Sequence, residues 1–139
     1  MTDFDLIKST FREVHRHFLY TYDHDQWEVP ERWDSHPDEV ERGEIFRGDC
    51  EDFALTTVEL LLRRGIPKEA CRLATCWTEL DEYHAVAVVE DERGVGWLID
   101  NRMRTLRPWA SVPGYRWHKS MRMDSIQPGK RFGEWRDAS

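Results

Sequence analysis

The sequence lacks the long apolar run and the leader pattern that would direct a protein into or across a membrane. No stretch approaches the roughly 20 apolar residues that a transmembrane helix requires. The first ten residues, MTDFDLIKST, contain no basic segment followed by an apolar one, so they do not resemble a secretory signal. We therefore expect a cytoplasmic protein without a membrane partner.

Cysteine is also scarce, and acidic residues outnumber basic ones by 27 to 20. The three cysteines are Cys50, Cys71 and Cys76, and an odd number in a chain without a leader argues against a disulfide framework. Cys71 and Cys76 have no histidine pair at ligand spacing, which argues against zinc. The net charge of −7 disfavours binding to nucleic-acid phosphates. The cysteines are therefore either buried small side chains or include one reactive thiol, and we interpret Cys71 and Cys76 as structural.

The chain is rich in tryptophan, with seven residues among 139, and aromatic residues make up 12%. This composition can bury a core, which argues against intrinsic disorder, and the length suits a single domain over residues 1–139. The seven tryptophans indicate a folded protein but no particular activity.

The first half of the chain has the apolar spacing of helices. The predicted helices cover residues 3–19, a short segment after Pro37 and residues 50–64. The first has one apolar stripe, and His15 and His17 lie outside it, so we expect both at the surface. The segment 50–64 is apolar nearly all round, which predicts a buried central helix that ends before Gly65.

After Pro67 the pattern changes to short segments typical of strands. The predicted strands are Arg72–Trp77, Tyr83–Glu90 and Gly96–Asp100, with a further one around Tyr115–Met123 and a weakly determined tail. Helices followed by antiparallel strands define the α+β class.

Cys50 falls in the first turn of the predicted central helix, directly after Asp49, a natural N-cap. Backbone N–H groups and the positive end of the helix dipole stabilise a thiolate there. The acids Asp49, Glu51 and Asp52 oppose this effect and raise the thiol pKa, so a reactive Cys50 needs a nearby imidazolium. The alternative is a buried cysteine at a helix start without a chemical role.

His84 opens one predicted strand and Asp100 ends the next. The connection contains Gly94, which suits a left-handed turn position, and folding the hairpin around Glu92 places His84 directly opposite Asp100 on one face. A slip of one residue would separate them. In this register Asp100 accepts a hydrogen bond from one imidazole nitrogen and the other nitrogen faces a thiol, as in a catalytic triad. Alone, His84 or Asp100 is equally well explained as a strand-end residue.

Three segments in this order resemble the bacterial transglutaminase-like cysteine proteinases. They are Gly48-Asp49-Cys50-Glu51-Asp52-Phe53-Ala54, His84-Ala85-Val86 and Trp97-Leu98-Ile99-Asp100-Asn101, preceded by Asp25-Gln26-Trp27 and Pro30-Glu31. The resemblance implies a papain/transglutaminase-like fold, in which N-terminal helices and a central Cys-bearing helix pack on an antiparallel β-sheet. It also implies a catalytic triad of Cys50, His84 and Asp100.

The same resemblance suggests further site residues. Trp27 is expected to line the cleft or to point its indole N–H at an oxyanion, or else to lie in the core. Gln26 is a second candidate oxyanion donor, beside the backbone N–H of Cys50. The residues Asp49 and Glu51, with Asp52 as a third candidate, match acids that bind calcium beside the catalytic cysteine in the family.

Oxygen ligands suit Ca²⁺, and a cation would offset the negative charge around the thiolate. The alternative for these acids is a solvated capping cluster. Well-known members of the family are periplasmic proteases that cleave a surface adhesin. This chain is shorter and has no leader, so an adhesin substrate does not follow. Short chains of this type are also similar to phage or prophage proteins.

The sequence therefore predicts a cysteine peptidase or amidase that hydrolyses a peptide or isopeptide bond through a thioester. Its partner is a protein or peptide substrate. Two alternatives stay open: transglutaminase-type acyl transfer to an amine, and a non-enzymatic binding or phage structural module on the same fold. The sequence does not predict the oligomeric state.

Overall fold

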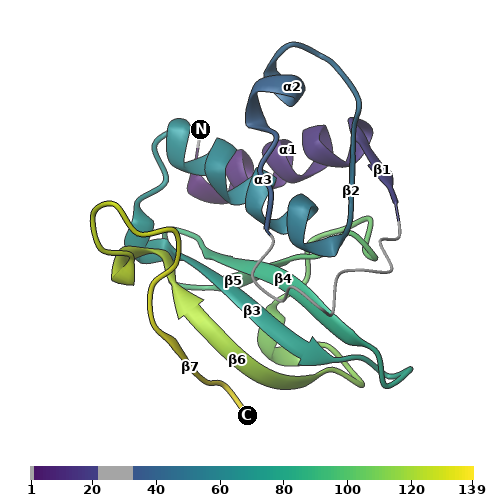
Figure 1. The fold of residues 1–139 in the computed structure, drawn as a ribbon, viewed down its shortest axis with the longest axis vertical. Helices are drawn as coiled ribbons and strands as arrows, with labels where there is room; N and C mark the ends of the chain where they lie inside the picture. Colours follow the sequence, from purple (N-terminus) through teal and green to yellow (C-terminus); the bar gives the residue numbers. More distant parts are fainter. Residues whose placement is uncertain (1, 22–32) are drawn as a thin grey trace.

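The structure is a computed structural model that describes residues 2–21 and 33–139. In it, three helices lie on one side of an antiparallel sheet (Figure 1). The helices are α1 (Asp3–Arg16), α2 (Pro37–Glu41) and α3 (Cys50–Arg63), with single 3₁₀ turns at Lys68–Ala70, Trp109–Ser111 and Met123–Ser125. None of the helices in the described ranges has the length and apolar content that a membrane span requires.

The strands form two sheets. They are β1 (Phe18–Tyr20), β2 (Phe46–Gly48), β3 (Cys71–Trp77), β4 (Tyr83–Glu90), β5 (Gly96–Ile99), β6 (Arg116–Arg122) and β7 (Trp135–Asp137). The pair β1–β2 is parallel, whereas the five-stranded sheet has the order β5-β4-β3-β6-β7 with all neighbours antiparallel. The predicted α+β class is confirmed, and the short strands β1, β2 and β7 are additions to it.

Helix α3 lies between α1 and the sheet, as its apolar character predicted. Phe53, Ala54, Val58, Leu60 and Leu61 are fully buried along it. The side chain of Asp49 caps its N-terminus, and Gly65 follows its C-terminus with φ +107°. A residue with a β-carbon is strained at that angle, so the glycine explains why the helix ends there.

Helix α1 ends at Arg16, three residues earlier than predicted, because Phe18 begins β1 and pairs with Phe46 of β2. The predicted apolar stripe is present, and Ile7, Phe11 and Val14 are fully buried.

The hairpin between β4 and β5 has a different register from the predicted one. Ala87 pairs with Ile99 and Glu90 with Gly96, because the turn is centred on Arg93 instead of Glu92. Direct opposition of His84 and Asp100 was therefore wrong. Since the shift is two residues, both side chains still lie on one face, now diagonally related.

Both faces of the sheet are covered. Leu73, Ala85, Ala87, Val89 and Ile99 belong to the core that includes the buried side of α3. On the opposite face, Ala74, Cys76, Val86, Val88 and Leu98 pack against the segment between β5 and β6 and against Trp117 in β6. Cys71 and Cys76 are buried in these two layers, and burial raises the pKa of each thiol to about 12. Both are therefore protonated packing residues, which fits their structural interpretation.

Candidate active site

The half-buried Cys50 is the first residue of α3. Burial raises the pKa of its thiol, and the charges of Asp49 and Glu51 raise it further. A hydrogen bond with the backbone N–H of Ala85, the residue after His84, acts in the opposite direction. The thiol therefore rests protonated, and it lies against the first residues of β4.

His84 and Asp100 form a buried hydrogen-bonded pair at the edge where β4 begins and β5 ends. The distance between His84 Nε2 and Asp100 Oδ1 is 2.8 Å, and the two residues are 7% and 1% exposed. Burial alone would raise the pKa of Asp100, but the hydrogen bond and charge of His84 outweigh it and lower the pKa. Asp100 is therefore an anion that accepts the proton on His84 Nε2, and Nδ1 is the ring nitrogen that does not bond to Asp100.

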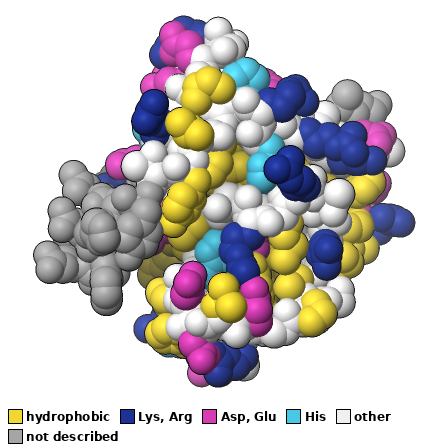
Figure 2. Space-filling model, turned by 90° about the vertical axis from the view of Figure 1, so that its right-hand side faces the viewer, with side chains coloured by type: hydrophobic (Ala, Val, Ile, Leu, Met, Phe, Trp, Pro, Cys, Tyr) yellow, Lys and Arg dark blue, Asp and Glu magenta, His cyan; other side chains and the backbone are white. Residues whose placement is uncertain are grey.

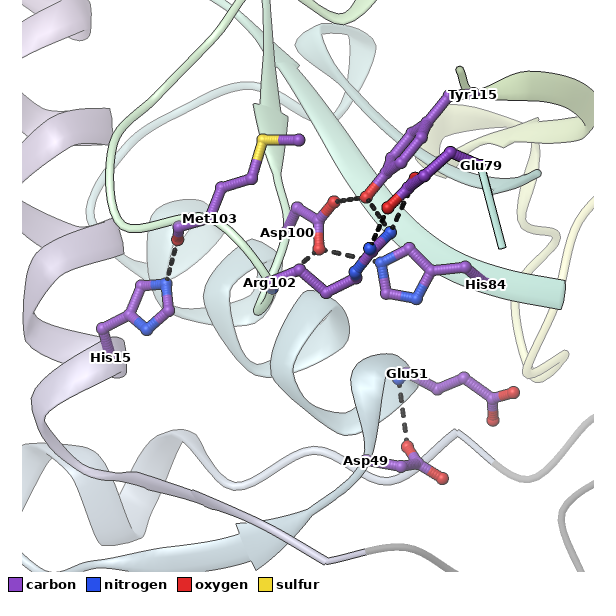
Figure 3. Close-up of polar contacts among 9 residues, drawn as sticks. All are labelled: His15, Asp49, Glu51, Glu79, His84, Asp100, Arg102, Met103 and Tyr115. Carbon is purple, nitrogen blue, oxygen red and sulfur yellow. Dashed lines mark hydrogen bonds and ion pairs between the residues drawn. The ribbon is translucent and has the colours of Figure 1, made fainter. Parts of the chain in front are cut away.

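The other ring nitrogen of His84 points toward the first turn of α3, where Asp49 and Glu51 lie (Figure 3). Cys50 stands between these two residues in the sequence. The structure thus brings the predicted nucleophile, base and orienting acid to one place, at the junction of α3 with β4 and β5.

Tyr115 and Arg102 also donate hydrogen bonds to Asp100, and both were missed from the sequence. Tyr115 donates its hydroxyl proton to Asp100 Oδ2 at 2.6 Å, and the backbone N–H of Arg102 donates to Oδ1 at 2.9 Å. Burial, followed by the hydrogen bond and charge of Asp100, raises the pKa of Tyr115, so the hydroxyl stays a donor. Asp100 therefore accepts hydrogen bonds from three directions and has one defined orientation.

Arg102 connects this site to the turn between β3 and β4. Its guanidinium donates to the Tyr115 hydroxyl at 3.0 Å and forms a bidentate ion pair with Glu79 (Figure 3). The arginine also lies over the Tyr115 ring at 5.7 Å. No sequence signal identified these contacts, because Glu79 lies in the β3–β4 turn and Arg102 and Tyr115 lie near opposite ends of the long β5–β6 connection, and only the folded sheet brings them together.

His15 also supports the segment after Asp100, in contrast to its predicted surface position. Its Nε2 lies 2.6 Å from the carbonyl oxygen of Met103 (Figure 3), and its ring packs against Phe11 and Phe53. Burial lowers the pKa of His15, so the ring is neutral and donates to the carbonyl. The prediction from its position outside the apolar stripe was wrong for His15, because the loop after β5 covers that side of α1.

The acids around Cys50 form the first turn of α3. Asp49 Oδ1 accepts the backbone N–H groups of Glu51 and Asp52 at 3.0 and 3.1 Å, and Asp52 Oδ1 accepts that of Asp34. Burial and the charge of Asp49 raise the pKa of Glu51 to about 8 and that of Asp52 to about 7. The carboxylates therefore repel one another.

The fit of these acids to a metal ion is partial. Three carboxylates in one turn have the oxygen chemistry that Ca²⁺ prefers. Within residues 2–21 and 33–139, however, no three acidic, histidine or cysteine side chains come together as a group that could hold a metal ion. Gln26 and Trp27 lie outside the described residues.

Comparisons with known proteins agree with this fold. The family model for the bacterial transglutaminase-like cysteine proteinases, BTLCP, matches residues 2–135. The chain therefore belongs to this family, and it is a cysteine peptidase with the papain/transglutaminase-like fold. Among curated proteins, no match was found.

Solved structures show the same architecture. LapG of Legionella pneumophila in its calcium-bound form has a TM-score of 0.65 at 21% identity, over 95% of this chain and 77% of LapG. The EGTA-treated form of LapG has a TM-score of 0.64 at 20% identity, over 98% and 77%. A protein from Cytophaga hutchinsonii has a TM-score of 0.59 at 14% identity, over 98% of this chain and 43% of its own. At these identities the likeness concerns the fold.

Proposed function

We propose that the protein hydrolyses a peptide or isopeptide bond with Cys50 as nucleophile, His84 as general base and acid, and Asp100 as the orienting acid. The observation that supports this most strongly is the buried 2.8 Å hydrogen bond between His84 and Asp100. It lies directly beside Ala85, whose N–H interacts with the Cys50 thiol. A buried carboxylate that fixes one imidazole nitrogen leaves the other for proton transfer with the nucleophile.

Because the thiol rests protonated, proton removal accompanies its attack on the substrate. The Cys50 Sγ–H proton moves to His84 Nδ1 as sulfur bonds to the carbonyl carbon, and negative charge develops on the carbonyl oxygen. The backbone N–H of Cys50 is the proposed donor to that oxygen, since N–H groups in the first turn of a helix have no intrahelical acceptor. The protonated His84 is stabilised by the Asp100 anion.

Collapse of the tetrahedral intermediate breaks the C–N bond, and His84 returns its proton to the leaving nitrogen. A thioester on Cys50 remains. His84 then takes a proton from water as the water oxygen bonds to the thioester carbon. The C–S bond breaks, the acid is released and the proton returns to sulfur.

Alkylation by iodoacetamide tests the nucleophile. In the wild-type protein, label is expected on Cys50, and Cys71 and Cys76 serve as internal controls because both are buried. The variants Cys50→Ala and His84→Ala should each abolish cleavage of casein, with the fold checked by circular dichroism. Label on Cys71 or Cys76 instead of Cys50, or full cleavage by Cys50→Ala, would overturn the assignment.

Acyl transfer uses the same thioester and differs only in the acceptor. Incorporation of dansylcadaverine into casein by the wild-type protein, without new peptide ends, would replace hydrolysis by transfer. We expect new peptide ends and no incorporation, because no feature of the described residues selects an amine over water.

Calcium at the first turn of α3 is a separate proposal, supported by the chemistry of Asp49, Glu51 and Asp52 and by their mutually raised pKa values. LapG is known in calcium-bound and EGTA-treated structures. When bound, the ion would supply positive charge that offsets the carboxylates beside Cys50. Titration calorimetry should detect Ca²⁺ binding by the wild type and by Glu59→Gln, two turns further along α3, but not by Glu51→Gln. Absence of heat in the wild type would refute it.

A further inference from the structure

Three of the large hydrophobic side chains that are exposed in the described residues lie on one hairpin. Trp77, Leu80 and Tyr83, here called the hairpin patch, are 41%, 64% and 49% exposed at the ends of β3 and β4 and in the turn between them. A group of exposed apolar side chains of this size on a protein surface is typical of a site that contacts another molecule.

The hairpin patch is held in a fixed shape before anything binds. Trp77 pairs with Tyr83 across the strands, with ring centroids 4.7 Å apart. The Tyr83 hydroxyl donates to Thr75 Oγ1 at 2.8 Å and lies 2.8 Å from His118 Nδ1. A preorganised aromatic surface loses little conformational entropy when it receives a ligand.

The hairpin patch is continuous with the nucleophile along the same face of the sheet. Thr75 pairs with Ala85, and Ala85 is the residue whose N–H interacts with the Cys50 thiol. The Tyr83 hydroxyl bonds to Thr75, so the tyrosine ring crosses β3 on the face that Ala85 shares with α3. Tyr83 and Trp77 therefore lie on the face of the sheet where the Cys50 thiol meets β4.

Most of the charge in the turn of the hairpin is compensated within the molecule. Glu79 forms its ion pair with Arg102, and Asp81 forms one with Arg116. Two of the three acidic side chains in the turn beside the hairpin patch are thus already paired, and the patch itself offers apolar contact. Figure 2 shows the side of the molecule on which the β3–β4 turn lies. On this side, hydrophobic side chains reach the surface among acidic and basic ones.

We propose that the hairpin patch is a substrate-recognition surface that binds a large apolar or aromatic side chain near the scissile bond of an extended protein segment. This inference rests on the proposed function. It assigns the enzyme a preference for substrates with such a side chain, which the triad alone does not provide.

A peptide library derived from a proteome, with cleavage sites mapped by mass spectrometry, measures this preference. The wild-type enzyme should favour Phe, Tyr, Trp, Leu or Met at one fixed position from the scissile bond. For a fluorogenic peptide of the favoured sequence, Trp77→Ala should lower kcat/KM roughly tenfold through KM, as loss of a central aromatic contact does. Trp77→Phe should recover most of this loss.

Ile45→Ser is the matched control, because Ile45 is 58% exposed and precedes β2, away from the hairpin. It should leave kcat/KM unchanged. Iodoacetamide should alkylate Cys50 at the same rate in wild type and Trp77→Ala, since the triad is untouched. If cleavage shows no apolar preference, or if Trp77→Ala and wild type have equal KM, the inference fails while the proposed function stands.

Two other results would also overturn the inference. If the wild type cleaves nothing in the library, the proposed function and the inference fail together. If sedimentation shows a dimer that Trp77→Ala converts to a monomer, the hairpin patch is an interface between two copies of the chain.

Discussion

The two hairpins that share β4 close in the same way at opposite ends of the strand. At the β4–β5 end, Asp91 N–H donates to the carbonyl of Val95 at 3.0 Å, and Gly94 N–H donates to the carbonyl of Asp91 at 3.0 Å. Asp91 Oδ1 also accepts the N–H groups of Arg93 and Val95.

The β3–β4 end repeats this arrangement with other residues. Thr78 N–H donates to the carbonyl of Glu82 at 2.9 Å, and Asp81 N–H donates to that of Thr78 at 2.9 Å. Thr78 Oγ1 accepts the N–H groups of Leu80 and Glu82 at 3.2 and 3.4 Å. The left-handed position is held by Asp81 at φ +58°, where the other turn has Gly94 at φ +82°.

The differences follow the location of the active site. The β4–β5 turn has glycine at the strained position and a carboxylate with several donors, both of which favour stability. The β3–β4 turn has a non-glycine residue there, a weaker hydroxyl acceptor and an exposed Leu80, and its Glu79 reaches the site through Arg102. The departures from optimal turn chemistry are therefore found at the end of β4 that contains His84.

The largest expected effect on the free energy of unfolding comes from replacing the side chain that accepts the hydrogen bonds of each turn, which belongs to Asp91 or Thr78. Asp91→Ala should lower the free energy of unfolding by about 2–3 kcal/mol, because it leaves several donors, including the partly buried Trp97 Nε1 at 2.9 Å, without an acceptor. Thr78→Ala should cost about 1 kcal/mol, since its bonds are longer and neutral. Urea unfolding measures both. Equal losses would show that the two turns contribute alike and would remove the contrast.

The pH dependence of stability sharpens the same contrast. Burial would raise the pKa of Asp91, but the hydrogen bonds of Trp97, Val95 and Arg93 outweigh it and lower the pKa to about 2 from the ordinary 3.8. A depressed pKa contributes stability that is present above about pH 4 and is lost as the pH falls toward 2. Thr78 does not titrate in this range.

The matched variant for this measurement is Asp91→Asn, which removes the charge and keeps the shape. Its stability deficit relative to the wild type should be constant at pH 5–7 and should shrink between pH 4 and pH 2. Comparison at each pH cancels the other carboxylates. A deficit that does not change with pH would show that the Asp91 charge has no part in closing the turn.

The elements with a strong periodic signal were predictable from the sequence. Helix α3 begins and ends at its capping residues, Asp49 and Gly65, and β4 spans Tyr83–Glu90 as predicted. In contrast, β1, β2 and β7 are three residues long, and so short a segment has no period to recognise. Their pairing is decided by contacts between distant parts of the chain.

The site was predictable only in part for the same reason. Cys50, His84 and Asp100 have local signals, namely a helix start and two strand ends. The register that relates His84 to Asp100 depends on which residue of Asp91–Gly94 centres the turn, and the sequence placed it one residue early. Tyr115 and His15 have no local signal, because their roles come from loops that fold back on β5.

Tyr115 tests whether the connection between the β3–β4 turn and the site has a functional effect. Tyr115→Phe keeps the ring and removes the hydroxyl that donates to Asp100 Oδ2. Asp100 should then hold His84 less strictly, and kcat for casein cleavage should fall roughly tenfold to a hundredfold, the effect expected for one hydrogen bond to a charged group. KM should be unchanged, since the hydroxyl that is removed bonds to Asp100 and Arg102.

The control for this variant is Ser111→Ala, whose hydroxyl bonds only to the exposed carbonyl of Pro108. It should leave kcat unchanged. ¹⁵N NMR of the His84 ring distinguishes an orienting role of Tyr115 from a purely structural one. Neutral His84 should keep its proton on Nε2 in the wild type and in Ser111→Ala, and should show both tautomers in Tyr115→Phe. A single tautomer with unchanged kcat would show that Tyr115 does not orient the pair.

The smallest expected effect comes from exchanging the left-handed residues of the two turns. Gly94→Asp places a β-carbon at φ +82° and should destabilise by about 0.5–1 kcal/mol. Asp81→Gly relieves the same strain, but it removes the exposed ion pair with Arg116 and loosens the unfolded chain, so we expect a gain of only about 0.5 kcal/mol or less.

The signs of these two stability changes say more about the difference between the turns than their sizes do. Opposite signs, measured by urea unfolding, would mean that the β3–β4 turn keeps a suboptimal residue that one substitution improves. Because Asp81 stands between Leu80 and Glu82 in the turn of the hairpin patch, Asp81→Gly should at the same time raise KM slightly for the favoured peptide by loosening the turn. If both variants lose stability, Asp81 is already the better residue at its position, and the difference between the two ends of β4 lies in the exposed side chains alone.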